Sequence, residues 1–339
     1  MQVPSLMRVF RRLAALSDRS LNRLLIGGAL VLVVGIPVVG VIYVTDRFVD
    51  PGPPLVQRQL VTAEEAVRKT PNNVGARLQL GAVYVAANRP DDAMKQYDEI
   101  LKAQPGHRGA LLARAQVQVA RGDLKGAASS FEQIVNDAKA GKGGEFAGAD
   151  PQLQQAYYGL GSIALKEGRT PDAVTALEAA LKIDPTDADA WNLLGQAQLK
   201  AGNGVAAVGA LRKAVLFVPT GWSEPYATLA QAYQLLGKTA EAEYATAMVD
   251  FNEKRPDQAK QRLEALTSGP IAVDAMLGLG MIAEAEGDRE AAARWYQKVL
   301  VGDPENFNAR VGLGRLDVEV PGGAHPGGDP ASPAPGGNG

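Results

Sequence analysis

Few residues in this 339-residue sequence could support acid–base or metal chemistry. There is no cysteine, and neither His107, in a predicted turn, nor His325, in a Gly/Pro-rich tail, has histidine or acidic partners nearby in the pattern. Catalytic and metal sites need such groups to converge. The Gly-Leu-Gly segments 159–161 and 278–280 lie within helical patterns without a preceding strand, so they do not fit a dinucleotide-binding loop.

The charged residues also indicate structure rather than catalysis. The paired carboxylates Glu64/Glu65 and Asp91/Asp92 are expected at helix starts, where negative charge stabilises the helix dipole. The net charge of −2 argues against a nucleic-acid partner, which would require a basic stripe. We therefore predict no catalytic residue, no metal ligand, no cofactor and no nucleic-acid binding.

A repeated pattern of short helices organises most of the chain. In residues 188–221 two helical patterns flank a break at Gly202, and Pro219 closes the unit. Gly161 stands 34 residues before Gly195 and takes the same place in the preceding copy. Six copies can be aligned in this way, at residues 74–107, from 108 onward, at 154–187, 188–221, from 223 onward and at 273–306.

This spacing of small and large residues resembles the tetratricopeptide repeat (TPR), a unit of about 34 residues built from two helices. The resemblance covers roughly residues 74–318. It implies an all-α fold, a TPR α-solenoid in which antiparallel helix pairs form a right-handed superhelix. Each unit of such an array packs on its neighbours, so the length of the chain does not imply two separate cores.

The N-terminal segment has the features of a membrane anchor. Residues 1–23 are basic, with five arginines, and residues 24–45 carry no charge. A helix of that length reaches roughly 33 Å, enough to cross a bilayer core of about 30 Å. We expect one transmembrane helix over 24–45, a cytoplasmic segment 1–23 by the positive-inside rule, and a stiff Pro/Gly spacer over 46–54. A buried helix or a cleaved signal peptide is the alternative.

We expect the TPR array to span residues 55–319, with about six repeats and capping helices at its ends. The spacing is interrupted twice: a glycine-rich loop is inserted at 138–151, and between Ala230 and Gly280 there is one predicted helix too many for simple pairs. Either the helix predicted at 241–253 belongs to two repeats, or a helix is missing. The Gly/Pro-rich tail 320–339 is predicted to be disordered.

The first helix of each pair presents a strip of residues to the groove that TPR proteins use for ligands. This strip has no Lys or Arg, which argues against capture of a C-terminal carboxylate by basic side chains, as in chaperone-binding TPR domains. Apolar residues with a few amides suit an extended or helical peptide instead. Alternatively, the same positions face other helices of the array. The predicted groove residues are Leu78, Leu112, Gln116, Tyr158, Asn192, Gln196 and Gln231.

These features together predict a single-pass membrane protein whose extracytoplasmic array is a scaffold for another protein or peptide, in assembly or quality control of an envelope complex. Its architecture is similar to the anchored TPR subunits of cytochrome c maturation, which is a narrower alternative. A homo-oligomeric structural element is a third. An enzyme with TPRs as a targeting arm would need a second folded domain, and no segment of sufficient length remains for it.

Overall fold

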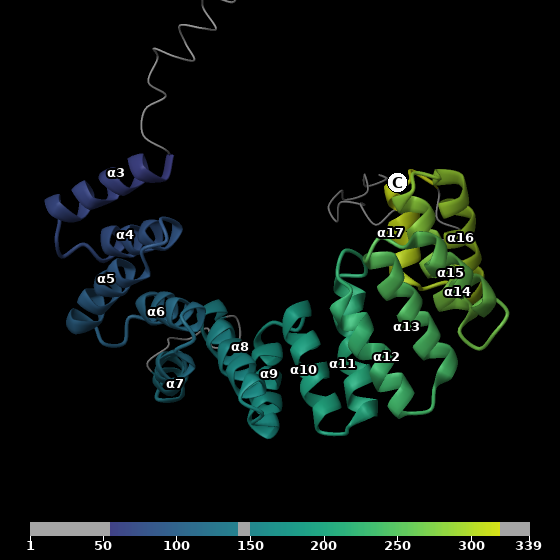
Figure 1. Cartoon of the computed structure of the whole chain (residues 1–339), viewed down its shortest axis with the longest axis horizontal. Helices are drawn as coiled ribbons and strands as arrows, with labels where there is room; N and C mark the ends of the chain where they lie inside the picture. Colours follow the sequence, from purple (N-terminus) through teal and green to yellow (C-terminus); the bar gives the residue numbers. More distant parts are fainter. Residues whose placement is uncertain (1–54, 142–149, 319–339) are drawn as a thin grey trace, which may run out of the picture. The chain divides into compact units, whose positions relative to one another are not determined.

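The computed structural model describes residues 55–141 and 150–318, and these ranges contain fifteen helices and no strand (Figure 1). The predicted segments 1–23, 24–45 and 46–54 and the tail 320–339 lie outside the described residues. Within the described ranges, no helix has the length and apolar character needed to cross a membrane.

The first described helix, α3 (Leu55–Lys69), belongs to a unit separate from the residues that follow it. It corrects one prediction, because Glu64 and Glu65 lie within the helix and not at its start. Asp91 and Asp92, by contrast, do occupy the first turn of their helix. The carboxylate pair at 64–65 was misplaced because the helix begins at Leu55 without an acidic residue in its first turn.

The second unit, from residue 70, is built mainly from helix pairs in which each helix packs against the next one along the chain. Its first four pairs are α4 (Val74–Ala86) with α5 (Pro90–Ala103), α6 (Arg108–Ala120) with α7 (Leu124–Lys139), α8 (Pro151–Lys166) with α9 (Thr170–Ile183), and α10 (Ala188–Lys200) with α11 (Gly204–Phe217). They are followed by α12 (Glu224–Leu235), α13 (Thr239–Asn252), α14 (Pro256–Leu266), α15 (Ala272–Ala285), α16 (Arg289–Gly302) and α17 (Phe307–Arg315).

Local sequence signals start and end these helices. The side chains of several residues accept a hydrogen bond from the backbone N–H three residues later, which satisfies a donor that the helix leaves free. His107 is one of them: its Nδ1 accepts from the N–H of Ala110 at 3.1 Å, so this histidine caps α6. The turn within a pair needs a positive φ, supplied by Gly202 (φ 77°) after α10 and by Asn88 (φ 56°) after α4.

Glycines inside the first helices let the paired helices approach closely. A Cβ added at Gly161 would lie 2.6 Å from Cγ of Leu177, and one added at Gly280 would lie 2.6 Å from Cε1 of Tyr296. Contacts this short do not occur between real side chains, so a larger residue would force the helices apart. The Gly-Leu-Gly segments 159–161 and 278–280 therefore serve helix packing, as their helical context predicts.

The second interruption of the repeat spacing is explained by α13, which packs against both α12 and α14. Ala247 lies 17 residues after Ala230, which is half of the 34-residue repeat, and 33 residues before Gly280, which is close to one full repeat. The helix buries residues on several faces, among them Ala242, Ala245, Ala247 and Met248. Of the two alternatives, the structure supports the one in which a single helix belongs to two repeats.

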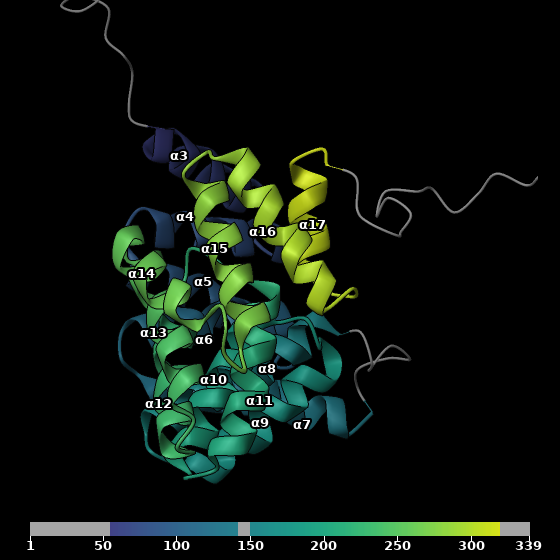
Figure 2. The same cartoon turned by 90° about the vertical axis from the view of Figure 1, so that its right-hand side faces the viewer.

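Beyond this shared helix, α15, α16 and α17 lie side by side (Figure 2). The last described helix ends at Arg315, a few residues before the predicted end of the array at 319. The predicted loop 138–151 is also shorter than expected, since α7 continues to Lys139 and α8 begins at Pro151. Asp150 explains the second boundary, because its Oδ1 accepts from the N–H groups of Gln152 and Leu153.

Candidate functional site

The first helices of successive pairs form one row, in which α4 contacts α6, α6 contacts α8, α8 contacts α10, and α10 contacts α12. All seven predicted groove residues lie on these five helices. Predicted groove residues that share a surface must therefore share it along this row of helices.

Two recesses lie along the row, one between α4 and α6 and the other between α6 and α8. The first has a volume of 560 Å³ and is lined by Leu78, Ala82, Val85 and Gln116, among others. The second has a volume of 270 Å³ and is lined by Gln116, Val119 and Tyr158, among others. Because Gln116 lines both, the recesses are neighbours and bring Leu78, Gln116 and Tyr158 onto one path; we call them together the groove.

The groove is mostly apolar, with polar groups at defined points. Burial raises the pKa of Tyr158, and the nearby carboxylates of Asp189, Asp187 and Glu224 raise it further. The phenol therefore stays protonated at neutral pH and can donate a hydrogen bond. Arg121 and Lys166 are the basic side chains that line the recesses, and Arg121 is held by Asp91 at 2.6 Å.

Farther along the row, α10 carries two of the four predicted amide residues, Asn192 and Gln196. Asn192 is only 3% exposed, and within the described part of the chain its Oδ1 has no hydrogen-bond partner. A buried acceptor without a donor costs free energy, but Asn192 lines neither recess, so this oxygen is not part of the groove surface. Gln196 is half-buried, and its Nε2 donates to Oε1 of Glu224 on α12 at 3.0 Å.

Four of the seven predicted residues line neither recess: Leu112, Asn192, Gln196 and Gln231. Leu112 is 6% exposed and belongs to the hydrophobic core of α6, α7 and α8, so its placement in the groove was wrong. Its position matches the alternative that the strip partly faces other helices. Gln231 is exposed on α12 but lines neither recess.

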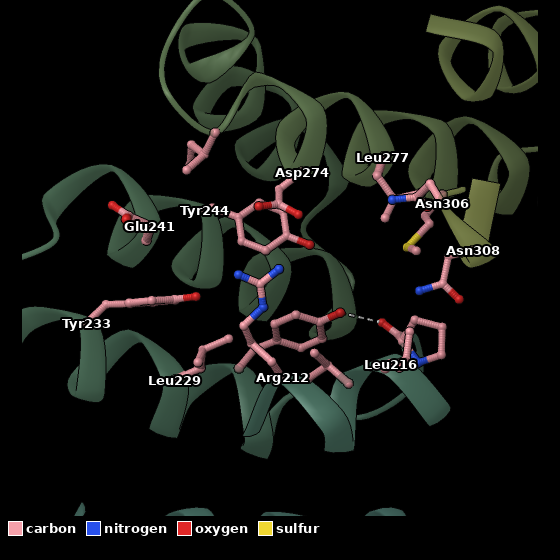
Figure 3. A pocket seen from close by; sticks show the side chains of 15 residues that line it. Arg212, Leu216, Leu229, Tyr233, Glu241, Tyr244, Asp274, Leu277, Asn306 and Asn308 are labelled. Carbon is pink, nitrogen blue, oxygen red and sulfur yellow. Dashed lines mark hydrogen bonds between the residues drawn. The ribbon is translucent and has the colours of Figure 1, made fainter. Parts of the chain in front are cut away.

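A further cavity lies at the shared helix and was not expected from the sequence. We call it the chamber; its volume is 130 Å³, and side chains of α11, α12, α13 and α15 converge on it (Figure 3). Its polar lining includes Arg212, Tyr233, Glu241, Tyr244 and Asp274. The only sequence signal for it was the break in spacing after Ala230, which marks the place but not the residues.

Burial dominates the electrostatics of the chamber. It raises the pKa of Asp274, an effect that Arg212 partly opposes. Burial also raises the pKa of Tyr244 and of Tyr226, whose hydroxyl donates to the carbonyl oxygen of Pro219 at 2.9 Å. In residues 55–141 and 150–318, no group of three or more His, Asp or Glu side chains could hold a metal ion.

The fold and this row of helices define a helical-repeat protein whose units are antiparallel helix pairs. The model of the tetratricopeptide repeat family matches residues 78–145, 158–225 and 244–307, more than half of the chain, so the chain belongs to that family. The third match begins inside α13, in agreement with its use as the first helix of a pair. TPR proteins are generally scaffolds that bind protein or peptide partners.

Several solved structures resemble this chain at low sequence identity. The crystal structure of MamA protein is 23% identical, covering 55% of this chain and 94% of that chain with a TM-score of 0.46. YrrB, described as a TPR protein with an unusual peptide-binding site, is 16% identical over 60% of this chain and 97% of that one, with a TM-score of 0.47. PilW, a type IV pilus biogenesis factor, is 20% identical over 71% and 98%, with a TM-score of 0.43. Comparison with curated protein sequences found no significant match.

Proposed function

We propose that this chain is a membrane-anchored scaffold that holds an extended or helical peptide segment of another protein in the groove along α4, α6 and α8. The observation that carries this proposal is the continuity of the two recesses through Gln116. Side chains such as Leu78 and Val119 would take apolar residues of the ligand. The hydroxyl of Tyr158 would bond the ligand backbone.

The anchor and the topology are parts of the same proposal, supported by the uncharged segment 24–45 and the arginine-rich segment 1–23. In this arrangement the N-terminus is cytoplasmic and the array extracytoplasmic, where it would act in assembly or quality control of an envelope complex. An alkaline-phosphatase fusion after Asp50 should be active. An inactive fusion there, together with an active cytoplasmic reporter at the same point, would overturn the topology.

Site-specific photocrosslinking in cells tests the groove. We expect a photoreactive residue at Gln116 or Tyr158 of the full-length chain to crosslink to one common partner. The same residue at Val205, which is 76% exposed on α11, should not. If position 205 crosslinks the same partner as strongly, the groove is not the site.

A charge substitution provides the matched comparison. Gln116→Lys places a charge where the two recesses meet and should abolish the crosslink from Tyr158. Gln104→Lys, at an exposed position just after α5, makes the same chemical change away from the groove and should leave the crosslink intact. Crosslinks between copies of this chain alone would replace the proposal with a homo-oligomeric element.

A further inference from the structure

The chamber lies where α13, a single helix, belongs to two repeats. Elsewhere in the row, each first helix is followed by its own second helix, and small residues close the space between them. At α13 the order is disturbed, and the space bounded by α11, α12, α13 and α15 is lined by long polar side chains instead. The chamber is thus a feature of this chain that the regular repeat does not produce.

Two oppositely charged side chains face each other in the chamber without forming an ion pair. Figure 3 shows Arg212 from α11 and Asp274 from α15 pointing into the same space. The guanidinium of Arg212 interacts with the hydroxyl of Tyr233, but within the described part of the chain no direct hydrogen bond or ion pair links it to Asp274. Glu241, the other carboxylate of the lining, lies 3.5 Å from Nζ of Lys238.

Two other polar groups of the chamber have partners of their own. The hydroxyl of Tyr226 donates to Pro219. The amide of Asn306 donates to Oδ2 of Asp303 at 3.0 Å, and its Oδ1 accepts from the N–H of Ala309. Arg212 and Asp274 are the oppositely charged donor and acceptor of the chamber, and no direct hydrogen bond within the described residues joins them to each other.

The size of the chamber suits a ligand no larger than the end of one side chain. The 130 Å³ of the chamber equals the space of roughly four water molecules at about 30 Å³ each. A second cavity of 460 Å³, which we call the vestibule, shares Pro219, Met281 and Asn308 with the chamber. Its lining also includes Phe251 and Ala285. A polypeptide in the vestibule could thus insert one short polar group into the chamber.

We propose that the chamber binds the side-chain carboxamide of a glutamine or asparagine in a partner polypeptide. The carboxamide NH₂ donates to the carboxylate of Asp274, and its oxygen accepts from the guanidinium of Arg212. A lysine would be repelled by Arg212 and a glutamate by Asp274, whereas the neutral carboxamide satisfies both. The inference rests on the proposed function only in that its ligand is a polypeptide, because the chamber lies outside the groove.

Capped peptides that differ at one position test this selectivity. The probes are acetyl-Ala-Leu-X-Leu-Ala methylamides with glutamine, glutamate or lysine at X, titrated into the full-length chain in detergent micelles. We expect the glutamine peptide to bind at least tenfold more tightly than the other two, because lysine meets the like charge of Arg212 and glutamate that of Asp274. Binding of all three within about threefold of one another would overturn the proposal.

Two substitutions should change the preference in opposite directions. Arg212→Met leaves Asp274 unbalanced and should make lysine the preferred residue. Asp274→Leu leaves Arg212 unbalanced and should make glutamate the preferred residue. A purely structural role would weaken all three peptides equally, and that result would refute the inference.

Controls separate this proposal from the groove and from misfolding. Gln116→Lys, in the groove, should leave the glutamine preference unchanged even if it abolishes partner crosslinking. Arg294→Met, on an exposed part of α16, should change nothing. Thermal unfolding checks that each variant is folded. If Asp274→Leu is not, the milder Asp274→Asn should cancel the discrimination against glutamate, and retained discrimination would count against the proposal.

Discussion

The assignment of α13 to two repeats makes a quantitative prediction about Asp250. This carboxylate is on α13, and its side chain is 8% exposed. It accepts hydrogen bonds from Nε and Nη2 of Arg255 at 3.0 and 2.6 Å, and from Nε of Arg262 on α14 at 3.0 Å. Asp250→Ala should therefore release α14 from the shared helix.

The expected size of the effect follows from the exposure of the partners. Removing one member of a buried ion pair costs about 3–5 kcal/mol when the remaining charge stays buried. Here Arg255 and Arg262 are 41% and 42% exposed, so water can solvate them after the substitution. We therefore expect Asp250→Ala to lower the local free energy of unfolding by about 2 kcal/mol, or about 30-fold in the opening equilibrium.

Hydrogen exchange of the full-length chain, followed by mass spectrometry, is the suitable assay because repeat arrays open locally. Protection should fall over α13 and α14 and stay unchanged over α4 and α5. Glu243→Ala is the matched control. Glu243 also pairs with Arg262, at 2.7 Å, but it is 49% exposed, so its removal should cost less than about 1 kcal/mol.

Two results would refute this reasoning. If Asp250→Ala and Glu243→Ala have equal effects, burial does not distinguish the two carboxylates. If the loss of protection extends evenly to α4 and α5, the shared helix is not a local unit.

Three further substitutions have defined outcomes. Lys254, with φ 62° after α13, occupies a turn that favours glycine, so Lys254→Gly should stabilise the chain by about 0.5–1 kcal/mol in urea unfolding. Asn192→Leu removes an unsatisfied buried oxygen and should raise stability by about 1 kcal/mol in urea unfolding, while partner crosslinking from Tyr158 stays unchanged. Burial raises the pKa of Asp274 above its ordinary value of 3.8, so as the pH rises this carboxyl ionises in the unfolded state before it ionises in the folded state. The group therefore destabilises the fold at higher pH. Asp274→Asn should stabilise the chain more at pH 7 than at pH 3 in urea unfolding.

The sequence predicted the helix pairs well because their signals are local. Gly202 marks a turn and Gly161 a close helix contact wherever they occur in the unit, so the 34-residue spacing gives both the fold and the pairing. The repeat spacing could not decide the role of α13. This helix carries the packing positions of a second helix toward α12 and those of a first helix toward α14, and neither set dominates the pattern.

The groove could be predicted less completely, because burial depends on neighbouring helices. Leu78, Gln116 and Tyr158 line the recesses, yet Leu112, one turn before Gln116, belongs to the core. Equivalent positions in successive repeats differ in exposure when the residues packed against them differ in size. The chamber could not be predicted at all, since Arg212 and Asp274 are 62 positions apart and meet only through the packing of α13.

The shared helix also has a mechanical consequence. Under tension applied to its two ends, an array of independent pairs would lengthen in equal steps, each of roughly 120 Å for 34 residues at about 3.5 Å per residue. At α13 no such step is possible, because pulling away α14 exposes a face that α12 does not cover. Residues 224–266 should therefore extend together by roughly 150 Å, and a force–extension trace of this chain would contain one long step among shorter ones.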